Sequence, residues 1–398
     1  MSEEKKERKQ KSKSRGNGDG TIYYLESKKL WAAQYTVGRD VNGKLKRKTV
    51  YGKSRKVVKE KINEIITQLN TRTFVDKSSV TVEQLIANLI EEDYELNIIG
   101  DNSYLRKTAT LNRIKSYPIG STPIQKATEA EIKEFLKGIT NYSNSVISKD
   151  YALLNRCFKV AVQKDIIVKN PMDGIRKPKS SKPTKKVRAL TIDEQKKLIN
   201  ILNNEEQNHP YRYQLLLMLY TGMRMGEINA LMFKDISFDF KTINVQRTLT
   251  KDKNEHTIIG KTTKTYAGQR LLSMTNTVYN LMKDYVDNHY KENKESLLFY
   301  DYRANKIITT NQCNMYLTRL KTRYDFIDEN VQGNVNLHSL RHTFATRCIE
   351  SNMPVKVLQH FLGHTDIKTT LDTYCDVFEK FEQEHITNAE AYLNQIMA

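Results

Sequence analysis

The sequence is poor in cysteine and has no long apolar run, and these two shortages exclude several kinds of protein. Its four cysteines are scattered along 398 residues without any Cys-x-x-Cys spacing, so neither a disulfide framework nor a zinc knuckle is indicated. No stretch of about 18 or more apolar residues occurs, and the N-terminus has no apolar signal region. We therefore expect a soluble, cytoplasmic protein that does not enter a membrane.

Acidic residues are scarce relative to basic ones. The chain has 65 lysines and arginines against 46 aspartates and glutamates, which gives a formal net charge of +19. Such a surplus favours a polyanionic partner; nucleic acid is the leading candidate and an anionic membrane surface is the rival. The sequence also lacks a Gly-x-x-x-x-Gly-Lys-Ser/Thr phosphate loop and a His-Glu-x-x-His motif. We therefore expect neither an ATP-driven reaction nor that type of zinc centre.

Length and patterning predict more than one folded unit, preceded by a basic arm. Residues 1–17 are charged and almost without apolar side chains, so they cannot support a core and are expected to be disordered. Residues 18–75 are predicted to form a small α+β unit, a three-stranded sheet covered by one helix. The strands are expected at residues 21–25, 30–37 and 45–51, and the helix at about 54–69.

A helical unit is predicted over residues 79–175. Capping boxes, in which Ser or Thr precedes Glu or Gln by three residues, mark helix starts at Thr81 and Thr128. Helices are expected at about 81–94, 102–114, 129–136 and 143–164. Residues 176–188 are rich in Lys, Ser and Pro, which indicates an extended basic linker. It is either a tether or a strap that crosses the backbone of a long polyanion.

The third unit, residues 189–398, is predicted to be mixed and mainly α. It opens at a capping box formed by Thr191 and Glu194. Strands are expected at 243–248 and 257–260, followed by a hairpin around residues 261–274. The C-terminal tail carries apolar residues in a pattern that suits packing on its own domain or on a neighbouring protomer.

Two short segments of this unit each place an arginine one helical turn from another polar residue that could share a site with it. Arg224 is expected just inside the helix that follows a Thr-Gly turn, and Glu227 lies three residues on, where its carboxylate could hold the guanidinium. Alone, such a pair is an ordinary ion pair of a helix surface. His338 and Arg341 are one helical turn apart, so both side chains can face one ligand atom.

His364 and Tyr374 complete a set of two arginines, two histidines and one tyrosine. Guanidinium groups can clamp a phosphate, imidazoles can move protons, and a phenol can attack phosphorus. The set suits phosphoryl transfer through a covalent bond between protein and DNA. Two histidine pairs with i, i+4 spacing, 338 with 342 and 360 with 364, also allow a zinc site, but no third ligand accompanies them in sequence.

The four segments, in their order and spacing, resemble the signature of the tyrosine recombinase (phage integrase) family. The boxes are matched by Thr-Gly-Met-Arg224-Met-Gly-Glu227, His338-Ser-Leu-Arg341, Leu362-Gly363-His364 and Leu-Asp-Thr-Tyr374. The resemblance covers essentially the whole chain and is nearest to integrases of conjugative transposons and temperate phages of Gram-positive bacteria. It implies an arm-site DNA-binding domain at 18–75, a core-binding domain at 79–175 and a catalytic domain at 189–398.

The resemblance also implies a role for each site residue, with no metal and no cofactor. Tyr374 would be the nucleophile and form a 3′-phosphotyrosyl bond, and His338 would assist proton transfer. Arg224 and Arg341, with Glu227 in support, would neutralise the phosphate, and His364 would hydrogen-bond it. The family's hairpin lysine, which protonates the leaving 5′-oxygen, is best matched by Lys264, with Lys261 as the alternative.

On this resemblance the chain works as a homotetramer on double-stranded DNA, through a Holliday junction, with an excision factor that sets direction. The tail would pack on a neighbouring protomer. Two alternatives are a type IB topoisomerase, which uses the same chemistry to relax DNA without exchanging partners, and a non-catalytic DNA-binding regulator with the same fold. The N-terminal sheet could instead be a protein-interaction module.

Overall fold

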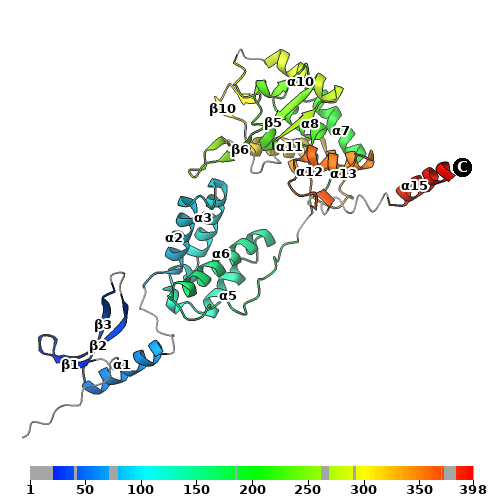
Figure 1. Ribbon diagram of the computed structural model, residues 1–398. Helices are drawn as coiled ribbons and strands as arrows, with labels where there is room; N and C mark the ends of the chain where they lie inside the picture. Colours follow the sequence, from blue (N-terminus) through cyan, green and yellow to red (C-terminus); the bar gives the residue numbers. More distant parts are fainter. Residues whose placement is uncertain are drawn as a thin grey trace, which may run out of the picture. The chain divides into compact units, whose positions relative to one another are not determined.

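The computed structural model describes residues 21–39, 43–70, 79–183, 186–260, 269–289, 293–368, 370–371 and 382–397. The chain is mainly helical with small antiparallel sheets, as the sequence predicts (Figure 1). It divides into two compact units, Met1–Glu92 with Lys107–Ser181 and Asp93–Arg106 with Lys182–Ala398. No helix among the described residues is long and apolar enough to cross a membrane.

The N-terminal sheet confirms the predicted strands and helix. Strands β1 (Thr21–Leu25), β2 (Leu30–Arg39) and β3 (Leu45–Gly52) pair antiparallel in that order, and helix α1 (Arg55–Asn70) follows. Alternate residues of a strand point to opposite faces. Ala33 and Tyr35 of β2 therefore lie on one face, where they pack with Val58 and Ile62 of α1.

The predicted helices of the next segment are also present, with boundaries shifted by one or two residues. They are α2 (Val82–Glu95), α3 (Asp101–Lys115), α5 (Glu129–Gly138) and α6 (Asn144–Gln163), with a short α4 (Pro118–Ser121). The capping boxes at Thr81 and Thr128 form as predicted, because each threonine hydroxyl accepts from a backbone N–H three residues on.

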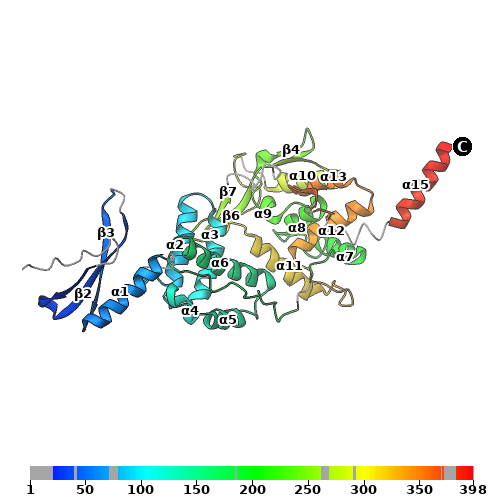
Figure 2. The same cartoon turned by 60° about the horizontal axis from the view of Figure 1, so that its bottom comes forward.

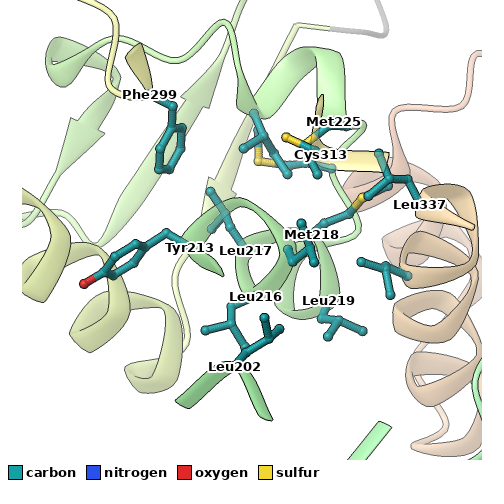
Figure 3. Close-up of a cluster of buried hydrophobic side chains, with 14 of the residues drawn as sticks. Leu202, Tyr213, Leu216, Leu217, Met218, Leu219, Met225, Phe299, Cys313 and Leu337 are labelled. Carbon is teal, nitrogen blue, oxygen red and sulfur yellow. The ribbon is translucent and has the colours of Figure 1, made fainter. Parts of the chain in front are cut away.

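The C-terminal unit surrounds a central helix, α8 (Arg212–Thr221). Nearly every side chain of α8 is buried, because its sequence is apolar on all sides rather than along one stripe. Figure 3 shows Leu216, Leu217, Met218 and Leu219 pointing into the surrounding core. This packing fixes the turn at the end of α8, which carries the arginine box.

Helices and short strands surround α8 (Figure 2). The helices are α7 (Ile192–Asn203), α9 (Met225–Ile228), α10 (Asn276–His289), α11 (Thr310–Tyr324), α12 (Leu337–Glu350) and α13 (Val355–Leu362). A further helix, α15 (Glu382–Met397), follows them in the sequence. The strands are β4 (Ile236–Ser237), β5 (Thr242–Val245), β6 (Thr248–Lys251), β7 (Thr257–Gly260), β8 (Arg270–Ser273), β9 (Tyr300–Asp301) and β10 (Lys306–Ile307). The capping box of Thr191 and Glu194 begins α7, as predicted.

The prediction of one strand over residues 243–248 is wrong. The segment holds two strands in different sheets: β5 pairs with β4 and β8, whereas β6 pairs with β7. The break comes at Arg247, whose guanidinium forms an ion pair with the buried carboxylate of Asp235. Residues 261–268 of the predicted hairpin lie outside the described residues, and the strands on either side pair with β6 and β5 rather than with each other.

Candidate active site

The turn after α8 places Arg224 one position outside the next helix. Gly222 ends α8 in the left-handed conformation, at φ 65°. Arg224 has extended backbone angles and is the N-cap of α9, so the prediction that it lies inside that helix is wrong by one position. The left-handed turn favours glycine, and an added Cβ at Gly222 would lie 2.4 Å from Phe344.

Arg224 and Glu227 form the predicted ion pair. The Glu227 carboxylate is 2% exposed, and its Oε1 accepts from Arg224 Nη1 at 2.8 Å. Its Oε2 accepts from the Arg224 backbone N–H at 3.0 Å, which holds both ends of the arginine. The Arg224 side chain is 43% exposed, so its guanidinium remains accessible to solvent although buried Glu227 fixes its orientation.

Arg341 is buried and bonded to two turns of the chain. Its Nη1 donates to the Gly222 carbonyl at 2.7 Å, and its Nη2 donates to the Leu362 carbonyl at 2.6 Å. The first carbonyl belongs to the arginine box and the second to the Leu-Gly-His box. One guanidinium therefore brings together segments that are 140 residues apart in sequence.

Three successive backbone carbonyls at the end of α13 each accept a hydrogen bond from a different arginine. Phe361 accepts from Arg270 Nε at 2.9 Å, Leu362 from Arg341, and Gly363 from Arg224 Nη2 at 3.3 Å. Gly363 is left-handed, at φ 61°, and this turns its carbonyl and the following His364 toward the arginines. The three carbonyls fix the spacing of the cationic groups.

His364 is held as a neutral imidazole with a defined tautomer. A guanidinium can only donate, so in its 2.9 Å contact with Arg341 Nη2 the Nε2 atom must accept. The proton therefore lies on Nδ1 and is donated to Thr370 Oγ1 at 2.8 Å. Burial, with the charges of Arg341 and Arg224, lowers the pKa of His364 to about 4, which agrees with a neutral ring.

His338 lies in the first turn of α12, one turn before Arg341. Asn336 caps this helix: its side chain accepts from the His338 backbone N–H at 2.8 Å. Burial and the charges of Arg341 and Arg224 lower the pKa of His338. Its ring meets that of His342 edge to face, with centroids 4.6 Å apart. No group of three His, Cys, Asp or Glu side chains suited to a metal occurs within the described residues.

Three of the predicted residues lie outside the described residues: Lys261, Lys264 and Tyr374. The described chain resumes after the lysine segment at residue 269, just before β8, and stops at residue 371, three residues before the tyrosine. The structure brings together Arg224, Glu227, Arg341 and His364, and a cleft of about 890 Å³ is lined by both Arg224 and His338.

Sequence reasoning missed two residues of this cluster. Arg270 donates to Glu227 Oε2 at 2.8 Å and is 1% exposed, and Gln359 donates through Nε2 to the His364 carbonyl at 2.9 Å. Arg270 begins a strand that follows the candidate lysine segment, and Gln359 lies on α13 four residues before Gly363. Neither belongs to a motif, so the only available signal was proximity in sequence to one.

Several named proteins match most of the chain. Residues 188–380 match the phage integrase family. A tyrosine recombinase XerC-like protein of Caldanaerobacter subterraneus subsp. tengcongensis is 26% identical, over 94% of this chain and 98% of that protein. The transposase from transposon Tn916 of Enterococcus faecalis is 25% identical, over 80% of this chain and 79% of that protein. The ICEBs1 integrase of Bacillus subtilis is 24% identical, over 71% and 76%.

Solved structures share the fold. The Tn1549 transposon integrase in complex with transposon right end DNA superposes with a TM-score of 0.64 at 23% identity, over 80% of this chain and 100% of that one. A lambda integrase tetramer bound to a Holliday junction gives a TM-score of 0.53 at 19% identity, over 87% and 95%. Residues 188–380 of the chain thus form a domain of the phage integrase family.

Proposed function

We propose that the chain is a site-specific recombinase that integrates and excises a mobile DNA element by cleaving and rejoining DNA through a tyrosine. The observation that carries the proposal is the convergence of Arg224, Arg341 and His364 on one helix end, inside the segment that matches the family. The names of the relatives, a transposon transposase and an ICEBs1 integrase, support a mobile element as the substrate.

In the proposed reaction the phenolic oxygen of Tyr374 attacks a DNA phosphodiester. A phosphotyrosyl bond to the 3′ end forms, the P–O5′ bond breaks, and a free 5′-hydroxyl leaves. A phenol has an ordinary pKa of about 10, so it must lose its proton as it attacks. In rejoining, another 5′-hydroxyl attacks the phosphotyrosyl phosphorus, a new P–O5′ bond forms and the bond to Tyr374 breaks. Because one phosphate ester replaces another, the cycle consumes no ATP.

Arg224 and Arg341 are suited to stabilise the phosphorane. Each guanidinium keeps its charge at all physiological pH values and can donate paired hydrogen bonds to the non-bridging oxygens. Arg224 is oriented by the buried carboxylate of Glu227 but remains partly exposed. Lys264 is the proposed acid for the leaving 5′-oxygen, with Lys261 as the alternative.

The two histidines have different proposed tasks. The lowered pKa of His338 keeps its imidazole neutral near pH 7, as an acceptor of the tyrosine proton must be. His364 would donate to the phosphate, but its Nε2 now accepts from Arg341. DNA binding is therefore proposed to transfer Arg341 from His364 to the phosphate, while the ring proton of His364 moves from Nδ1 to Nε2 and Thr370 Oγ1 becomes the donor to Nδ1.

The N-terminal sheet is proposed to bind distal arm sites. Its face away from α1 carries Gln34 and Thr36 of β2, opposite Thr49 and Arg47 of β3. These side chains can donate and accept hydrogen bonds, and Arg47 adds an exposed positive charge. A sheet with such a face suits the major groove, which admits a β-ribbon.

The proposed assembly is a homotetramer on two double-stranded core sites, with a Holliday junction as intermediate and a separate excision factor that sets direction. The lambda integrase tetramer bound to a Holliday junction supports this assembly. The reaction would take place in the bacterial cytoplasm, where the DNA lies. The helices at residues 79–175 are proposed to bind the DNA of the core site.

A nicked suicide substrate tests the proposed chemistry. Because the nick lets the cleaved fragment escape, wild-type protein should accumulate as a covalent DNA adduct visible on a denaturing gel. Tyr374→Phe should bind DNA normally and form no adduct, whereas Tyr302→Phe, which alters an exposed tyrosine elsewhere, should react normally. An adduct with Tyr374→Phe would reject the nucleophile. Relaxation of supercoiled DNA without joined products from two duplexes would favour a topoisomerase.

Matched charge changes test the arm-site proposal. Arg47→Ala should weaken binding to distal arm sites, whereas Lys59→Ala, which removes an equal exposed charge from α1, should not. Deleting residues 1–75 should abolish arm-site binding and spare core-site cleavage. Arm-site binding that survives the deletion would show that this assignment is wrong.

A further inference from the structure

Arg270 is a buried arginine that no part of the proposed reaction uses. It is the first residue of β8, where it pairs with Val245 of β5, and its side chain is 1% exposed. Burying a guanidinium so completely is costly unless each charge is paired. Its position at the centre of the site therefore calls for a function.

The contacts of Arg270 join the two boxes that hold the other arginines. Its Nη2 donates to Glu227 Oε2 at 2.8 Å, and Glu227 in turn holds Arg224. Its Nε donates to the Phe361 carbonyl at 2.9 Å, one residue before the carbonyl that receives Arg341. Arg270 thus touches the supports of both phosphate-binding arginines without taking the phosphate's place.

The Leu-Gly-His box leaves space for this guanidinium. A Cβ built on Gly363 would lie 2.8 Å from Arg270 Nη1 and 3.1 Å from its Cζ. Any side chain at residue 363 would therefore displace Arg270, besides straining a left-handed backbone. Glycine is therefore required at residue 363 both by its left-handed backbone and by the close approach of Arg270.

Arg270 also lies close in sequence to the candidate lysines. Residues 261–268, which contain both of them, end two residues before it. The antiparallel pairing of β8 with β5 holds Arg270 in register at this point.

We propose that Arg270 is a positioning residue for DNA strand transfer: it holds Glu227 and the 361–363 turn at the spacing that aligns Arg224, Arg341 and His364 on one phosphate. This inference rests on the proposed function. Arg270 acts through these groups and does not contact DNA. A displacement of about 1 Å in such a site can cost about 100-fold in rate, so loss of Arg270 affects the chemical step more than DNA binding.

The charges around Glu227 support this role. Burial would raise the pKa of the Glu227 carboxyl, but the charge and hydrogen bond of Arg270, with those of Arg224, hold that pKa below its ordinary value. The carboxylate thus stays ionised next to Arg224. Without Arg270, only Arg224 would oppose the effect of burial.

The test compares full-length Arg270→Lys and Arg270→Ala with the same changes at Arg247. Arg247 is a fair control because it is also a largely buried arginine, paired with buried Asp235, with no hydrogen bond to Arg224, Arg341 or His364 among the described contacts. We measure the single-turnover rate of adduct formation on the nicked substrate, core-site affinity and the melting temperature. Arg270→Lys should cleave about 100-fold more slowly with affinity within about threefold of wild type.

Two further measurements separate positioning from simple loss of folding. Guanidinium ion at millimolar concentration should partly restore the cleavage rate of Arg270→Ala but not of Arg247→Ala. Arg270→Gln should lose cleavage as pH falls into the mildly acidic range, because the buried Glu227 carboxyl, then paired only with Arg224, protonates more easily.

The outcomes are distinct. Absence of an adduct with wild-type protein would reject the proposed function itself. If wild type reacts and the Arg270 variants lose no more rate than the Arg247 variants at matched melting temperature, Arg270 is merely structural and the inference is overturned. A rate loss that guanidinium does not reverse and that leaves the pH profile unchanged would overturn it as well.

Discussion

At the scale of single residues, two left-handed glycines determine where the arginines lie. Gly222 ends α8 and presents its carbonyl to Arg341, and Gly363 ends α13 next to His364. Both positions combine positive φ with close packing, so no other residue fits without movement. The turns are as much a part of the site as the charged groups are.

Gly222→Ala should therefore impair both stability and cleavage. The new methyl group would meet Phe344 and Leu362, and the left-handed backbone would be strained. We expect a loss of about 1–3 kcal/mol in the free energy of unfolding. Adduct formation should also slow, because the Gly222 carbonyl moves away from Arg341. Urea unfolding and single-turnover cleavage measure the two effects, and Gly174→Ala, at a left-handed position with open space around it, is the control. Equal rate losses in both variants would contradict this account.

His342 and His364 predict how stability depends on pH. Burial is the main cause that lowers the pKa of each to about 4, against an ordinary value of 6.5. Between these values the unfolded chain binds more protons than the folded one, so stability falls as pH drops from about 6.5 to 4 and is independent of these groups above it.

His342→Gln should reduce this dependence. Comparing urea unfolding at pH 7 and pH 5 should show a smaller loss for the variant than for wild type. An unchanged pH dependence in His342→Gln would contradict the assignment.

The candidate residues Arg224, His338, Arg341 and His364 could be selected from the sequence because each belongs to a short motif, but most of their partners could not. Glu227 was found because it lies three residues from Arg224, and the ion pair is confirmed. Arg270 was not, because its contacts with Glu227 and Phe361 span 43 and 91 residues of sequence. Such contacts depend on tertiary packing. The roles of Lys264 and Tyr374 stay predictions.

At the scale of elements, local chemistry predicted helix starts well. The capping boxes at Thr81, Thr128 and Thr191 all form, because a cap depends only on residues three apart. The strands around residue 247 were misjudged, because whether an apolar run continues or breaks depends on a distant partner, here Asp235. Periodicity within the run contains no information on that partner.

Asn336→Ala tests how far the cap of α12 matters to the site. The Asn336 side chain accepts from the His338 backbone N–H, so its removal should cost about 1 kcal/mol of stability and loosen the turn that carries His338. Thr191→Ala removes a cap of similar worth from α7, away from the site. We expect similar losses of stability in urea, but slower adduct formation only for Asn336→Ala. Equal rates of adduct formation by Asn336→Ala and Thr191→Ala would show that the cap of α12 has no role in cleavage.

At the scale of the whole molecule, the C-terminal helix α15 has large apolar side chains that are exposed to solvent. Ile386, Leu393, Ile396 and Met397 are 56% to 76% exposed. Side chains of this kind suit burial against another copy of the chain, as expected for a tail that links protomers on DNA.

Charged substitutions on α15 should therefore disrupt assembly and spare the fold. Leu393→Asp with Ile396→Asp should weaken cooperative binding of paired core sites in a gel-shift assay and leave the melting temperature unchanged. Asn394→Asp adds charge to an exposed polar position of the same helix and should have little effect. Normal pairing by the double variant would rule out the tail as the link between protomers.

The three arginines at the end of α13 also occupy the negative pole of that helix. The peptide dipoles of a helix sum to about half a negative charge at its C-terminus, and Arg341 touches the C-terminal end of α8 as well. Part of the site's positive potential is therefore balanced before DNA arrives. A small anion such as inorganic phosphate gains little there, because it must compete with two helix ends. A DNA phosphodiester, held by contacts along the rest of the duplex, can make that exchange.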